Sequence, residues 1–191
     1  MRINNIALTI HKNAVEHGWW EEERSAGEII SLCHAELSEA LEAYRNGEEL
    51  VWINDGKPDG IAVELIDCVI RIFDALEYCS VHIEQEINKI GYQGDIKTIA
   101  ADVHKQLLDS KLMLCIKSPG DMINVLHTLL ASGWSNPYQT EWVDYNTEAM
   151  IYCTLIIFGY LDGEGVDIEH TISLKHKYNT TRPYKHGGKK I

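Results

Sequence analysis

The chain has 191 residues, 45% of them hydrophobic and 24% charged, which is an ordinary composition for one folded globular domain. The formal net charge of −12 argues against a nucleic-acid partner, because such proteins present a basic face. The five cysteines are odd in number and widely spaced, so we expect reduced thiols rather than disulfides. We find no signal-peptide pattern and no run of about 20 apolar residues, and therefore expect a cytoplasmic protein without a membrane partner.

Hydrophobic residues recur at helical spacing along most of the chain. Residues 3–10 carry a short apolar stripe, and Gly18 ends that helix. Ser25 and Glu28 form a capping box that begins the next helix, which ends at Gly47.

A loop over residues 48–59 separates this helix from a strongly apolar one, for which Asp59 is the expected N-cap. Further helices are expected over residues 83–90, 95–116, 119–133, 148–161 and 167–178. No alternating strand pattern competes with these segments. The sequence therefore predicts an all-α fold, a single domain over residues 1–191 with a four-helix-bundle core.

Two parts of the chain are similar to each other. Residues 65–87 align without gaps with residues 150–172, and residues 34–41 align less well with residues 104–111. Apolar helices can match by composition alone, but we favour an internal duplication. It predicts an active helical repeat, a degenerate helical repeat and a basic C-terminal tail, over residues 1–92, 95–178 and 179–191.

Four acidic residues of the first repeat form the patterns Glu36-x-x-Glu39 and Glu64-x-x-Asp67. Each pair lies on one helix face, so two facing helices would bring four carboxylates together. Oxygen ligands of this kind suit Mg²⁺, with Mn²⁺ as the substitute. Solvated helix faces give the same pattern, whereas a di-iron bundle would need a Glu-x-x-His motif, which is absent. The second repeat has mostly lost these acids.

Residues 175–191 hold six of the 17 Lys and Arg residues of the chain and no acid. A basic terminus is often simply solvated. An acidic metal site together with cationic groups nevertheless suits a polyphosphate ligand.

Three blocks of the chain, residues 18–47, 60–76 and 176–191, resemble the MazG-like members of the all-α nucleoside triphosphate pyrophosphohydrolase superfamily. They carry the family signature, E-x-x-E followed after a spacer by E-x-x-D. The resemblance implies a helical enzyme that hydrolyses a nucleoside or deoxynucleoside triphosphate to the monophosphate and pyrophosphate with Mg²⁺. The alternatives are a dUTPase-like enzyme restricted to one base, and a non-catalytic helical module that binds nucleotide or a partner protein.

The resemblance also implies roles for individual residues. The catalytic metal ligands would be Glu36, Glu39, Glu64 and Asp67, with one of the glutamates orienting the attacking water instead. Contacts with phosphates or sugar would come from four residues near the C-terminus, namely Lys177, Asn179, Arg182 and Lys189. Arg71 would reach a phosphate or pair with Asp74. Trp20 or Trp19 would stack on the base or pack in the core.

Between about residues 91 and 165 the chain departs from the family pattern. Compact members of the family are much shorter, and two subunits complete each other's helical bundle. Here the degenerate repeat would supply those helices within one chain. The expected partner of the chain is its nucleoside triphosphate substrate. The chain would either form a homodimer with a second copy of itself or be a monomer with an internal pseudo-dimer.

Overall fold

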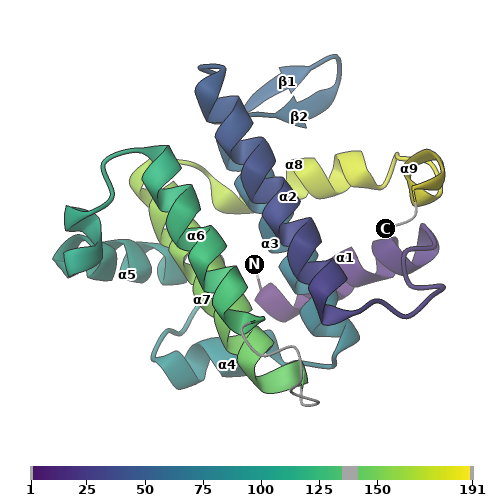
Figure 1. Ribbon diagram of the computed structural model, residues 1–191, viewed down its shortest axis with the longest axis horizontal. Coiled ribbons are helices and arrows are strands. Elements are labelled where there is room, and N and C mark those ends of the chain that lie inside the picture. Colours follow the sequence, from purple (N-terminus) through teal and green to yellow (C-terminus); the bar gives the residue numbers. More distant parts are fainter. Residues whose placement is uncertain (1, 135–141, 190–191) are drawn as a thin grey trace.

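The computed structural model describes residues 2–134 and 142–189 (Figure 1). The first half of the chain forms α1 (Ile3–Glu16), α2 (Ala26–Arg45), α3 (Ile61–Tyr78) and α4 (Ile83–Ile90). The expected capping box begins α2, because the Ser25 hydroxyl accepts a hydrogen bond from Glu28 N while the Glu28 carboxylate accepts one from Ser25 N. The central helix is α3, which is buried along almost its whole length.

The second half forms α5 (Ile96–Asp109), the 3₁₀ helix η1 (Lys111–Leu114), α6 (Pro119–Gly133), α7 (Trp142–Gly163), α8 (Ile168–Asn179) and α9 (Lys185–Gly188). The all-α expectation is therefore confirmed for the described part of the chain. Lys190 and Ile191 of the basic tail lie outside it. Among the described residues, no single helix has the length and hydropathy of a membrane span. Residues 146–163 and 168–179 reach that length and hydropathy only when they are taken together, and the two segments are bent by 115° relative to each other.

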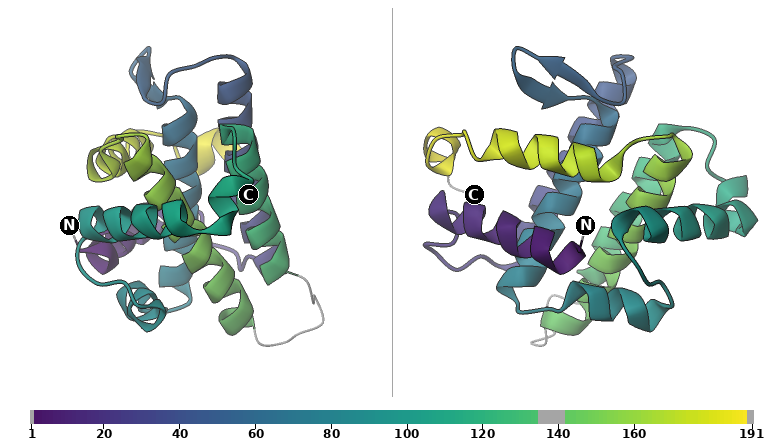
Figure 2. Two further views of the ribbon diagram at one scale, coloured as in Figure 1. Left: turned by 90° about the vertical axis from the view of Figure 1, so that its left-hand side faces the viewer. Right: turned by 180° about the vertical axis from the view of Figure 1, so that it is seen from behind.

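The expectation of a plain loop over residues 48–59 is wrong. β1 (Trp52–Asn54) and β2 (Lys57–Asp59) pair as an antiparallel hairpin around Asp55-Gly56. Asp-Gly is a typical hairpin turn because both residues tolerate a positive φ, here 47° and 85°. The hairpin extends beyond the end of α2, and β2 packs against α3 and α8 (Figures 1 and 2).

Asp59 does not cap α3 as expected. The N-cap is Gly60, with a φ of 112°, and a Cβ there would collide with the carbonyl oxygens of Glu49 and Leu50. The carboxylate of Asp59 pairs instead with Lys57, whose Nζ lies 3.2 Å from Oδ2. The side chain of Lys57 is thereby held on the hairpin near the start of α3.

The two halves of the chain are arranged alike. In the first half α1 and α2 pack on α3, as α5 and α6 pack on α7, and α8 packs on α3 as α4 packs on α7. The buried positions correspond as well, since Ile3, Ile6, Ala7 and Ile10 of α1 match Ile96, Ile99, Ala100 and Val103 of α5. The counterpart of α2 is therefore α6, and the weaker alignment of residues 34–41 with residues 104–111 is wrong.

Corresponding residues meet where the halves join. Phe73 and Phe158 are fully buried and pack edge to face, with ring centroids 6.4 Å apart. His34 of α2 and His127 of α6, 93 positions apart in the chain, stack with centroids 5.0 Å apart and Nδ1 atoms 2.7 Å apart. Contacts between equivalent residues are expected around a twofold axis, so this arrangement agrees with an internal duplication.

Candidate functional site

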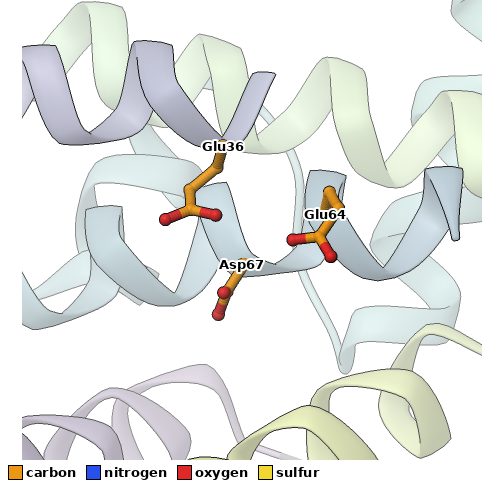
Figure 3. A group of neighbouring side chains, drawn as sticks. All are labelled: Glu36, Glu64 and Asp67. Atoms are coloured by element: carbon orange, nitrogen blue, oxygen red, sulfur yellow. The ribbon is translucent and has the colours of Figure 1, made fainter. Parts of the chain in front are cut away.

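Three carboxylates gather between α2, α3 and α8. Glu36 comes from α2, and Glu64 and Asp67 come from α3, where their spacing of three residues puts them on one face. Their ligand oxygens all lie within 4.8 Å of one another, and all three residues are buried (Figure 3). Buried carboxylates are unfavourable unless they are neutralised, so the cluster needs cations.

Three basic side chains neutralise part of this charge, and the most distant is Lys57, whose Nζ lies 4.0 Å from Glu64 Oε1. Arg71 Nε donates to Glu36 Oε1 at 2.5 Å. Lys175, which is only 2% exposed, has its Nζ 3.3 Å from Glu64 Oε2 and 3.2 Å from Asp67 Oδ2. The ammonium group therefore connects the C-terminal half of the chain to the acids of the first half.

Burial has the largest single effect on the pKa values of these groups. It raises the pKa of Glu36 from 4.5 to about 7, assisted by the Asp67 charge and opposed by Arg71. It likewise raises the pKa of Glu64 from 4.5 to about 7, although Lys175 opposes the shift. For Lys175 burial acts in the opposite direction, but the Asp67 and Glu64 carboxylates outweigh it and the pKa is raised. The lysine is thus a permanent positive charge in the site.

A narrow cleft of about 60 Å³ opens beside the acid cluster. Polar groups at its wall include Asp67, Arg71, Asp74, Asn179 and Arg182. Asn179 Nδ2 donates to Asp67 Oδ1 at 3.3 Å, whereas Asn179 Oδ1 is buried and has no hydrogen-bond partner among the described residues. Such an unmet buried acceptor is uncommon in a folded protein and leaves Asn179 Oδ1 able to accept from a ligand or bind an ion.

Two aromatic side chains, Trp19 and His186, line the cleft. Trp19 and His186 pack edge to face with ring centroids 4.9 Å apart, and the guanidinium of Arg24 lies 5.0 Å from the Trp19 ring. Burial, followed by the charges of Arg182 and Arg71, lowers the pKa of His186 to about 4. The imidazole is therefore neutral at physiological pH.

His186 belongs to a C-terminal strap, residues 183–188, which folds back onto its own chain. The ring of Tyr184 covers Gly18, and its hydroxyl donates to the carboxylate of Glu21. Lys185 Nζ lies 3.4 Å from Glu21 Oε2. A Cβ at position 18 would collide with the Tyr184 ring, so glycine there permits the strap to close.

The predicted site residues fall into two groups. Those at the cluster or the cleft are Glu36, Glu64, Asp67, Arg71, Asn179 and Arg182. Glu39 is exposed on α2 and lies outside the group of three carboxylates. Lys177 and Lys189 are exposed and do not line the cleft.

Of the two tryptophans considered for stacking on a base, Trp19 lies at the cleft and Trp20 does not line it. Trp20 stacks on Tyr78 with ring centroids 3.9 Å apart, and its Nε1 donates to Asp74 Oδ1 at 2.8 Å. This matches the core alternative that the sequence left open. Asp74 is therefore bonded to Trp20, while Arg71 pairs with Glu36.

Lys175 is the main residue that the sequence-based site omitted. It follows Ile168, Thr171 and Ile172 at helical spacing on the buried face of α8, one turn before Asn179. A lysine on an otherwise apolar helix face was therefore the sequence feature that could have indicated this residue.

Larger hollows, of about 570 and 560 Å³, border α4 and contain none of the predicted site residues.

Comparisons with protein-family models, with curated proteins and with solved structures find no match for this chain.

Proposed function

We propose that the protein is a Mg²⁺-dependent hydrolase that cleaves between the α- and β-phosphates of a nucleoside triphosphate and releases the monophosphate and pyrophosphate. The observation that carries this proposal is the meeting of three buried carboxylates with the buried Lys175 ammonium beside a cleft that Asp67 lines. An acidic metal site adjoining fixed cations suits the binding of a polyphosphate. The resemblance of the sequence to the all-α pyrophosphohydrolases points the same way.

The residues present fit a hard divalent cation. The cluster offers oxygen atoms only, from Glu36, Glu64 and Asp67, and neither histidine nor cysteine joins it among the described residues. Asn179 Oδ1 adds a buried acceptor without a partner next to Asp67. Glu39 stays the predicted fourth ligand. When bound, Mg²⁺ supplies charge neutralisation for the triphosphate and lowers the pKa of a coordinated water.

The cations around the cluster would bind the phosphates. Lys175 and Arg71 already contact the carboxylates, and Arg182 lines the cleft together with Arg71. Arginine presents a planar fork that matches phosphate oxygens, whereas lysine acts as a point charge. Trp19, rather than Trp20, is the better candidate to stack on the base, since it lies at the cleft with its ring against His186.

The cleft is far smaller than the roughly 300–1,000 Å³ of a typical ligand pocket. A nucleotide therefore fits only after one wall moves. The strap is held to the rest of the chain by exposed contacts, because Tyr184 and Glu21 are both more than half exposed. Substrate entry would accordingly separate residues 183–188 from residues 17–21.

The experiment is an assay of purified protein with each of the common ribo- and deoxyribonucleoside triphosphates in the presence of Mg²⁺. Pyrophosphate and the monophosphate are the expected products. Release of orthophosphate would refute the proposed bond cleavage. Nucleotide binding without turnover would favour the non-catalytic module, and turnover of dUTP alone would favour the dUTPase-like enzyme.

Asp67→Asn tests the site directly. The substitution keeps the volume of the side chain but removes one negative charge, so turnover is expected to fall by at least about 100-fold while the helical circular dichroism is retained. Glu42→Gln, on an exposed position of α2, is the matched control and is expected to leave turnover unchanged. Full activity of the Asp67→Asn protein would overturn the assignment of the site.

A further inference from the structure

Asp74 is a half-buried carboxylate at the cleft that the proposed chemistry does not use. It lies on α3 seven residues after Asp67, and both line the same cleft. Seven residues correspond to two helical turns, about 10.5 Å along the axis. Asp74 is therefore separated from the acid cluster by roughly the span between the phosphates and the nucleoside of a nucleotide.

Two donors from the N-terminal segment fix the orientation of Asp74. His11 Nδ1 lies 2.7 Å from Asp74 Oδ1, and Trp20 Nε1 donates to the same oxygen at 2.8 Å. Trp20 is itself held by stacking on Tyr78. The hydrogen bond to Asp74 raises the pKa of His11, which favours a protonated His11 as the donor.

The second oxygen of this carboxylate is able to accept further hydrogen bonds. No described residue forms a hydrogen bond or ion pair with Asp74 Oδ2, since both bonds to the side chain end on Oδ1. An ionised carboxylate can only accept hydrogen bonds. It therefore attracts N–H and O–H groups and repels carbonyl and phosphate oxygens.

We propose that Asp74 accepts a hydrogen bond from an N–H or O–H group on the nucleoside part of the substrate and so determines which nucleotides are hydrolysed. This inference rests on the proposed function. Two groups on a nucleotide have the required chemistry, the exocyclic amine of cytosine or adenine and a hydroxyl of the sugar. His11 and Trp20 are positioning residues, because they act through Asp74.

The preference of the unaltered protein is the first measurement. Comparing kcat/KM for CTP with UTP and for ATP with ITP tests the amine, because each pair exchanges an amine for a carbonyl. Comparing CTP with dCTP, and dCTP with its 3′-deoxy analogue, tests the sugar hydroxyls. At least a tenfold preference for the donor is expected in one of these two sets, and equal rates in both would overturn the inference.

Asp74→Asn is the second measurement, and it predicts more than a loss of activity. The two donors would keep the amide oxygen on their side, so the amide NH₂ would face the cleft in place of the free carboxylate oxygen. The preference is then expected to fall at least tenfold or to invert, in whichever set the unaltered protein discriminates. A purely structural role would lower all rates and leave these ratios unchanged, which would overturn the inference.

Glu77→Gln is the matched control, since Glu77 lies on the same helix near His11 but does not line the cleft. Glu77→Gln is expected to leave the kcat/KM ratios between paired nucleotides unchanged. If it changed these ratios as much as Asp74→Asn does, the effect would be assigned to His11 and the role of Asp74 would be overturned. Absence of turnover with every nucleotide would refute the proposed function. Turnover without selectivity would refute the role of Asp74 alone.

Discussion

Replacing Glu64 by glutamine is expected to stabilise the metal-free protein at alkaline pH. Glu64 is 3% exposed, and its pKa is raised from 4.5 to about 7 by burial, against the attraction of Lys175. The unfolded chain therefore ionises this carboxyl more readily than the folded protein does. Ionised Glu64 consequently costs about 3 kcal/mol of folding free energy at pH 8, and under about 1 kcal/mol at pH 5.

The sign follows from proton binding. Between pH 4.5 and about 7 the folded state holds a proton on Glu64 that the unfolded state has lost, so stability decreases as pH rises through this window. Glutamine does not titrate. The stability of Glu64→Gln relative to the unaltered protein should therefore increase by about 2–3 kcal/mol from pH 5 to pH 8, or about 5–10 °C in Tm.

The assay is urea denaturation at both pH values, with EDTA to remove divalent ions. Glu42→Gln is the control, because Glu42 is 59% exposed and should show no such change between pH 5 and pH 8. Excess Mg²⁺ at pH 8 should stabilise the unaltered protein and have a much smaller effect on Glu64→Gln. A stability difference that is the same at both pH values would refute the reasoning.

Two further predictions concern the strap and the junction of the halves. Gly18→Ala places a Cβ against the Tyr184 ring at a φ of 79°, so limited proteolysis should cleave the C-terminal tail faster, whereas Gly47→Ala, with a φ of 71° and open space, should not change the cleavage rate. Burial lowers the pKa of His34 and of His127, so the unfolded chain binds more protons and acidification below about pH 6.5 should destabilise the fold. In urea titrations, the stability of the double variant His34→Gln, His127→Gln should depend less on pH than that of the unaltered protein. An equal pH dependence of stability in the two proteins would contradict this prediction.

The sequence predicted the helices well because each helix is indicated by residues that lie close together in the chain. The capping box at Ser25 and the apolar stripe of the first helix depend on neighbours in the chain. The hairpin was missed although Asp55-Gly56 is a strong turn signal, because its two strands are only three residues long. Short strands show too little alternation to be recognised.

The site was predictable only in part. The spacing of Glu64 and Asp67 fixes a shared helix face, and Glu36 could be placed opposite them by assuming that two helices pack. Spacing cannot tell that Glu39 is exposed, because both glutamates of that pair fit the same pattern. Lys175 lies 111 positions from Glu64, and such a contact follows from the tertiary fold rather than from any local pattern.

The two halves of the chain supply different side chains to the acid cluster, and this limits how far the chain can be shortened. Acids sit on the N-terminal half, while the ammonium and amide that contact them, Lys175 and Asn179, arrive from the far end of the C-terminal half. Shortening the chain to its acid-bearing part would remove Lys175 and leave the three carboxylates to Arg71 and the more distant Lys57. The C-terminal half carries none of the three carboxylates but is still needed to neutralise them, so a chain cut between the halves should lose stability unless the two pieces reassemble.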